Sequence, residues 1–105
     1  MYYITYIEVG LSSEKIEHFK QNIRNRYILE VKVWRIEDSR YPSKLKYSLI
    51  FIEYKTGRRV LMDNHYPKNP HLHLDELEVN YDFKDVDTLL KDFRNFVFEH
   101  FGEKI

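Results

Sequence analysis

The chain of 105 residues contains no cysteine and only three glycines and three prolines. The absence of cysteine excludes disulfide scaffolds, thiolate zinc fingers, iron–sulfur proteins and enzymes with a cysteine nucleophile. The scarcity of glycine and proline, together with 43% hydrophobic residues, excludes disordered and fibrous chains. A small globular protein remains, and at this length we predict a single domain over residues 1–105.

Long hydrophobic runs are also missing. No segment approaches the ~18 apolar residues that a membrane-spanning helix needs. The N-terminal residues do not show the basic segment followed by an apolar one that is typical of a secretion signal. We therefore expect a cytoplasmic protein that does not bind membranes.

The chain also has no net charge at pH 7, because its 17 Lys and Arg residues balance its 17 Asp and Glu residues. This balance argues against a protein that holds nucleic acid through a uniformly basic surface. The charges are unevenly placed, however: residues 20–68 carry 12 basic and 5 acidic side chains, and residues 71–105 carry 4 and 9. Such a bias can arise by chance in a small domain. It can also indicate a basic, RNA-facing region beside an acidic region that a partner covers.

The pattern of apolar residues predicts an α+β fold. Alternation indicates strands at 2–9, 27–36, 47–54 and 59–64, and Lys55-Thr56-Gly57 is typical of a hairpin turn. The last three strands would form a small antiparallel sheet, a three-stranded meander, with the N-terminal strand beside it. The pattern of residues 71–79 is short and mixed and indicates no element.

Two amphipathic helices are expected to cover this sheet. The first would begin at a cap on Ser12 or Ser13, with Ile16, Phe19 and Ile23 at helical spacing. The second would begin after Asp85 and end at Gly102, because apolar residues between them recur at the spacing of one helical face. That face consists of Leu89, Leu90, Phe93, Phe96, Val97, His100 and Phe101.

The segment DNHYPKNPHLH, residues 63–73, concentrates the polar chemistry and contains three of the five histidines. Pro70 favours an extended chain, in which His71 and His73 point to the same side. Two such imidazoles could act as general base and general acid without a cofactor. Alternatively they could hold a divalent metal, with His65 or Asp63 as third ligand, or they could belong to a solvated structural loop.

The candidate site residues fall into two groups. In the catalytic group, a carboxylate could orient one imidazole through its second ring nitrogen, although it could equally just end a strand. That group is His65, His71, His73 and Asp63. In the substrate-binding group, cations could hold a phosphate and an aromatic ring could stack on a base, although charged strand edges are also common. That group is Arg58, Arg59, Lys68, Asn64 and Tyr66.

The order of these features resembles the TumE family of prokaryotic toxin–antitoxin proteins. A strand, the Lys55-Thr56-Gly57 turn and a second strand lead into Asp63-Asn64-His65. The loop with His71-x-His73 follows, and then Tyr81-x-Phe83 and a terminal helix, so that the resemblance covers about residues 45–101. It implies a growth-inhibiting toxin that is neutralised by a cognate antitoxin, typically a small DNA-binding protein. It also implies functional positions at Asp63, Asn64, His65, His71 and His73.

The residues and the resemblance together predict a toxin that acts on RNA. A ribonuclease without metal needs a base for the 2′-hydroxyl, an acid for the leaving oxygen and a cation for the phosphate, and the histidine loop offers all three. The alternative is a non-catalytic binding or regulatory module whose histidine loop is structural or binds metal. The sequence leaves homo-oligomerisation open.

Overall fold

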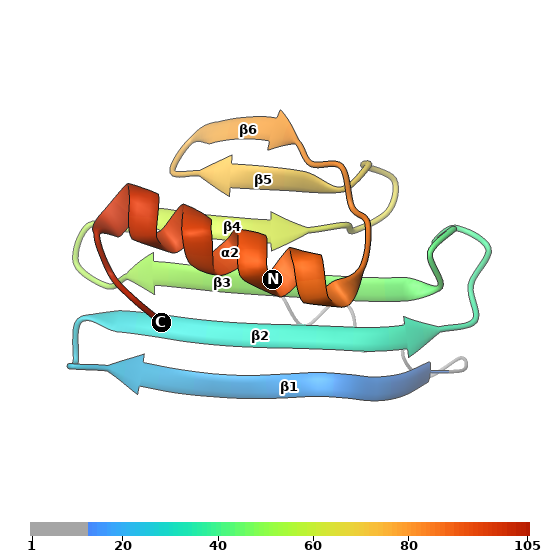
Figure 1. Cartoon of the computed structure of the whole chain (residues 1–105), viewed down its shortest axis with the longest axis horizontal. Coiled ribbons are helices and arrows are strands. Elements are labelled where there is room, and N and C mark those ends of the chain that lie inside the picture. The colour runs from blue at the N-terminus through green and yellow to red at the C-terminus, as the bar shows by residue number, and fades with distance from the viewer. Residues whose placement is uncertain (1–12) are drawn as a thin grey trace.

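The computed structural model describes residues 13–105, which form a six-stranded antiparallel sheet and one helix (Figure 1). Each strand pairs with the next one along the chain, so the strand order in space equals the order in sequence. The fold is therefore α+β, as predicted. The elements are β1 (Ser13–Ile23), β2 (Tyr27–Ile36), β3 (Leu45–Glu53), β4 (Arg59–Asp63), β5 (His71–Leu74), β6 (Leu77–Asn80) and α2 (Val86–Phe101).

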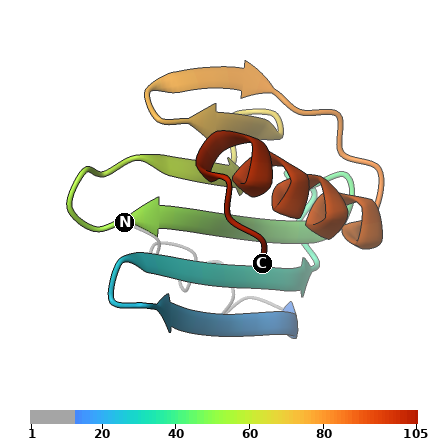
Figure 2. The ribbon, with the colours of Figure 1, turned by 60° about the vertical axis from the view of Figure 1, so that its left-hand side comes forward.

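The helix covers one face of this sheet. Figures 1 and 2 show α2 running across the middle strands, with β1 and β6 at the two edges. Leu89, Phe93 and Val97 lie one helical turn apart on α2 and are at most 2% exposed. They pack on alternate residues of the inner strands, so the core is the layer between α2 and the sheet. The opposite face of the sheet carries the polar residues described below.

Both ends of α2 are where the sequence predicts them. The carboxylate of Asp85 accepts a hydrogen bond of 2.7 Å from the backbone N–H of Thr88, and this bond lowers the pKa of Asp85. Gly102 adopts φ 72°, and its N–H donates to the carbonyl of Phe98 at 2.7 Å. Among the described residues, no helix combines the length and the apolar character needed to cross a membrane.

The predicted N-terminal helix is wrong, because Ser13–Ile23 forms the edge strand β1. Arg24 and Asn25 both have positive φ, 53° and 51°, as a tight hairpin turn of the primed type requires. This turn pairs β1 with β2 from Ser13 opposite Ile36 to Ile23 opposite Tyr27, with one shift of register between Lys15 and Glu17. Pairing with a strongly apolar neighbour therefore overrode a weak helical spacing. The predicted strand at residues 2–9 lies outside the described residues.

The predicted three-stranded sheet is too small. Strands 27–36, 47–54 and 59–64 are present as β2, β3 and β4, with ends shifted by at most two residues. Residues 71–80, for which the sequence indicated no element, add the hairpin β5–β6 with Asp75 at φ 55° in its turn. Its strands have only four residues each, and although apolar and polar residues alternate in both, such short segments do not identify a strand by themselves.

Candidate functional site

The histidine pair lies on the face of the sheet opposite α2. Asp63, the last residue of β4, is directly opposite His71, the first residue of β5. Their neighbours Met62 and Leu72 point into the core. Because side chains alternate along a strand, Asp63, His71 and His73 all project from the other face. The structure thus brings together three of the four predicted catalytic residues.

His71 is held from both sides of its ring. Its Nε2 lies 2.9 Å from Oδ1 of Asp63, and its Nδ1 lies 2.8 Å from the carbonyl oxygen of Asn69. The carbonyl is an acceptor, so Nδ1 carries a hydrogen, and Nε2 faces the carboxylate of Asp63 at ion-pair distance. The side chain is only 5% exposed. His71 is therefore fixed in orientation and shielded from solvent.

His73 is the more accessible member of the pair. Its ring stands edge-to-face against His71, with 4.6 Å between the ring centroids, and its side chain is 20% exposed. Burial lowers the pKa of His73 below the ordinary 6.5, the charge of His71 lowers it further, and Asp63 and Glu78 act against both. At neutral pH the ring is therefore uncharged and carries a lone pair that can accept a proton.

A cation completes this group of side chains. The ammonium of Lys68 lies 3.0 and 3.2 Å from the two carboxylate oxygens of Glu78, and Oε1 of Glu78 is 3.8 Å from Nδ1 of His73. The hydrogen bond from Lys68 is the main reason why the pKa of Glu78 is lowered. The side chain of Lys68 is 60% exposed. A polar chain thus runs from Lys68 through Glu78 and His73 to His71 and Asp63.

Glu78 and the Asn69 carbonyl are functional candidates that the sequence did not reveal. Glu78 lies opposite His73 in the β5–β6 hairpin. Only the prediction of that hairpin could have found it, and its strands of four residues are too short to be predicted from their alternation. The contribution of Asn69 is a backbone atom, for which the sequence carries no signal.

Asn64 uses its amide to extend the pairing of β3 and β4. Its Oδ1 accepts a hydrogen bond of 2.9 Å from the N–H of Tyr47, and its Nδ2 donates to the carbonyl of Leu45 at 2.8 Å. The residue is 7% exposed. Both functional groups of Asn64 therefore serve the backbone, and its predicted role in substrate binding would require these bonds to break.

Replacing Asn64 by alanine is expected to lower the free energy of unfolding by about 1–3 kcal/mol, because the buried N–H of Tyr47 loses its acceptor. Urea denaturation followed by circular dichroism measures the change. Asn80→Ala is the control, since Asn80 is exposed on the edge strand β6. Equal stability of the two variants would contradict the structural role of Asn64.

His65 lies on the side of β3, apart from the histidine pair. Its Nδ1 is 2.6 Å from Nζ of the buried Lys46, which also donates to the hydroxyl of Tyr41 at 2.9 Å. An ammonium only donates hydrogen bonds, so Nδ1 accepts and the proton of the neutral ring is on Nε2. His65 is exposed, and no contact found among residues 13–105 joins it to His71 or His73.

The two arginines lie at the other end of β4. Arg58 donates to the carbonyl of His100 at 3.0 Å and places its guanidinium 4.9 Å from the centre of the Phe101 ring, so it holds the end of α2. Arg59 donates to the carbonyl of Gly57 at 3.1 Å. Of the three predicted phosphate-binding cations, the structure therefore connects only Lys68 with His73.

Tyr66 is exposed at the opposite end of the sheet from these arginines. The guanidinium of Arg40 lies 5.3 Å from the centre of its ring, and its backbone N–H donates to the hydroxyl of Tyr41 at 3.2 Å. The ring is 46% exposed. Its exposed part is accessible to solvent, and its role as a stacking residue stays a prediction.

Asp63, His71 and His73 could also hold a metal ion. Each offers one ligand atom, and these atoms lie within 4.8 Å of one another. Two imidazoles and one carboxylate suit a transition metal such as zinc, and the bond from Nδ1 of His71 to a carbonyl is typical of metal-bound histidines. The ion would have to replace the direct contact between His71 and Asp63. Asp63, not His65, would be the third ligand.

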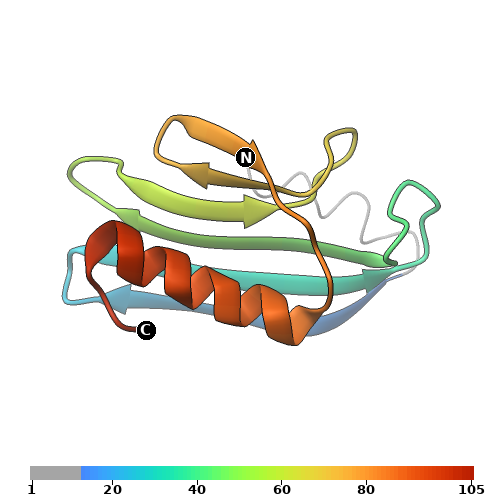
Figure 3. The same cartoon turned by 45° about the horizontal axis from the view of Figure 1, so that its top comes forward.

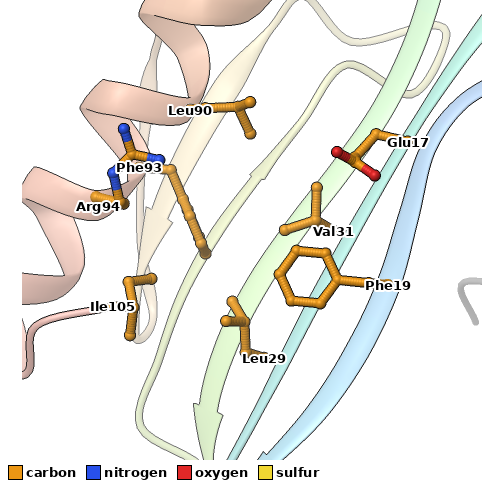
Figure 4. Close-up of a pocket in the computed structure, with 8 residues that line it drawn as sticks. All are labelled: Glu17, Phe19, Leu29, Val31, Leu90, Phe93, Arg94 and Ile105. Carbon is orange, nitrogen blue, oxygen red and sulfur yellow. The ribbon is translucent and has the colours of Figure 1, made fainter.

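The helix side of the sheet has a concave surface that is separate from the histidine pair (Figure 4). It is a groove of about 360 Å³ between α2 and the strands β1 and β2. Its walls are mainly apolar and include Phe19, Leu29, Val31, Leu90, Phe93 and Ile105. Among residues 13–105, the charged side chains that line it are Glu17 and Arg94, and no histidine lines it.

One comparison with known proteins gives a match. A family model described as Toxin TumE matches residues 5–100, which include all of the candidate site residues. The similarity therefore extends well beyond residues 45–101, where the sequence motifs lie. No curated protein and no solved structure is similar enough to count as a match.

Proposed function

The chain belongs to the TumE toxin family, and on this basis we propose that it is the toxin of a toxin–antitoxin pair and cleaves RNA with the histidine pair of β5. The observation that carries the proposal is His73. Its ring is uncharged and reaches solvent, and it lies between a buried, oriented histidine and an exposed lysine. Family membership implies an antitoxin partner, and we propose a small DNA-binding protein in that role.

The proposed reaction is an internal transfer at phosphorus. His73 takes the proton of a ribose 2′-hydroxyl, and the oxygen forms a bond to the adjacent phosphorus while the bond from phosphorus to the 5′-oxygen breaks. The leaving oxygen takes up a proton. The products are a 2′,3′-cyclic phosphate and a 5′-hydroxyl, with no metal and no change of oxidation state.

The other residues receive separate roles. Asp63 and His71 are positioning residues, since His71 is too buried to touch RNA and instead orients and polarises the ring of His73. Lys68 binds the phosphate. To do so it breaks its ion pair with Glu78, which costs little because exposed ion pairs of this kind are weak. His65 is assigned to the leaving oxygen: as its Nε2 gives up a proton, its Nδ1 takes one from the ammonium of Lys46, so the ring stays neutral. This role requires the RNA strand to cross the β4–β5 loop.

A metal-binding module is the second candidate, and the cluster of Asp63, His71 and His73 favours it. In that case the two imidazoles ligate an ion and do not exchange protons. Removal of the ion would then lower the thermal stability of the protein without affecting any RNA.

The purified toxin, freed of antitoxin, is expected to cleave single-stranded RNA in the presence of a chelator and to leave 2′,3′-cyclic phosphate ends. The same oligonucleotide with 2′-deoxyribose at the cleaved position is expected to stay intact, because the attacking hydroxyl is missing. Gel electrophoresis and mass spectrometry of the products measure both results. Cleavage that appears only with added zinc or manganese, or cleavage of the deoxy control, would contradict the proposed chemistry.

A further inference from the structure

Three loops at one end of the sheet enclose a pocket of about 420 Å³. They are the β2–β3 loop, the β4–β5 loop and the connection from β6 to α2, and Figures 1 and 3 show them at the same end of the molecule. The volume is in the range of small-ligand sites. Arg40, Tyr66, Lys68, Asn69 and Tyr81 are among the lining residues.

We propose that this pocket binds one unpaired nucleobase of the RNA, which stacks on the ring of Tyr66. The inference rests on the proposed function and adds the subsite that recognises the substrate. Single-stranded RNA is held mainly by stacking of splayed bases on aromatic rings and arginine planes. Tyr66 and Arg40 provide both surfaces, with the guanidinium 5.3 Å from the ring centre.

This stacking surface is held in place before any ligand arrives. The carboxylate of Asp38 accepts hydrogen bonds from Nε of Arg40 at 3.0 Å and from Nη2 at 2.5 Å, and these bonds lower the pKa of Asp38 to about 2. The backbone of Tyr66 is tied to the hydroxyl of the buried Tyr41. Binding therefore costs little conformational entropy at these residues.

The pocket lies beside the proposed catalytic pair. Lys68 lines the pocket and contacts Glu78, which is next to His73. Asn69 lines it as well, and its carbonyl orients His71. A base in the pocket would thus place its neighbouring phosphate near Lys68 and its ribose toward β5. The side-chain amide of Asn69 offers a donor and an acceptor to the base edge.

The test uses RNA that cannot be cleaved, so that binding is measured separately from chemistry. Oligoribonucleotides with every 2′-hydroxyl methylated and a fluorescent end label are titrated with the protein, and anisotropy gives the Kd. Tyr66→Ala is expected to weaken binding roughly 5- to 150-fold, the loss of one stacked base. Tyr66→Phe keeps the ring and is expected to stay within about threefold of the unaltered protein.

Tyr54 supplies the matched control. It is 51% exposed, similar to Tyr66, but follows β3 at the opposite end of the sheet. Tyr54→Ala is expected to leave the Kd unchanged, and equal melting temperatures of the variants would show that their folds are intact. Binding by Tyr66→Ala that equals the unaltered protein, or an equal loss in Tyr54→Ala, would overturn the subsite.

The outcome is separable from that of the proposed function. If methylated RNA binds through Tyr66 and ordinary RNA is not cleaved, the pocket stands and the ribonuclease proposal fails. If ordinary RNA is cleaved and Tyr66→Ala binds methylated RNA normally, the ribonuclease proposal stands and the stacking subsite is wrong.

Discussion

Replacing His73 by alanine is expected to abolish growth inhibition and to slow RNA cleavage by about 10²- to 10⁴-fold, the usual contribution of a general base. His73 is the catalytic candidate that is both uncharged at neutral pH and within reach of solvent at the histidine pair. Colony formation after induced expression measures toxicity. Initial rates on a labelled oligoribonucleotide measure cleavage, with the unaltered protein at the same concentration.

The single variant is a sharper test than a double replacement of His71 and His73. Loss of His71 would leave the carboxylate of Asp63 and the carbonyl of Asn69 without their partner, so a folding defect could imitate a catalytic one. His18→Ala is the matched control. His18 is an exposed histidine on the edge strand β1, far from β5, and it pairs with Glu30 of the neighbouring strand β2 at 3.3 Å. Full toxicity of His73→Ala would refute the catalytic assignment.

Replacing Phe93 by alanine is expected to lower the free energy of unfolding by about 3–5 kcal/mol. Phe93 is 2% exposed and lies between Leu89 and Val97 on the face of α2 that packs on the sheet. Within the described residues α2 is the only helix that covers the apolar face of the strands. No other described helix could move in to fill the cavity that the substitution leaves between α2 and the sheet. Urea denaturation with a two-state fit gives the value.

Phe98→Ala controls for the loss of an aromatic ring from the same helix. Phe98 is 53% exposed, and its replacement is expected to change the free energy of unfolding by no more than about 0.5 kcal/mol. A similar loss of stability in the two variants would mean that α2 packs on the sheet through a different face.

The elements that the sequence predicted well are those with strong local signals. The bounds of α2 follow from the carboxylate of Asp85 and the left-handed Gly102, both of which act within one helical turn. The strands β2, β3 and β4 carry long apolar alternation. The helix predicted over Ser13–Ile23 failed because its three apolar residues fit helical spacing only loosely, and pairing with β2 along its length outweighed that signal.

The candidate site divides in the same way. The common direction of His71 and His73 follows from the two-residue period of an extended chain, and the structure places both on one face. The contact of Asp63 with a histidine was also expected, and it is made to His71, although its role in catalysis stays a prediction. Arg58 and Arg59 lie at the other end of β4 from Asp63 and donate to the carbonyls of His100 and Gly57, so their role in binding phosphate stays a prediction.

By itself, the sequence determined the α+β class, the terminal helix, the TumE resemblance and the direction of the histidine pair, because each depends on residues that are close along the chain. The tertiary structure alone decided that β1 is a strand, that Glu78 and Lys68 stand beside His73, and that Asn64 belongs to the backbone pairing of β3. These features depend on strand register and turn geometry. Register is a property of two distant segments together, and neither segment specifies it alone.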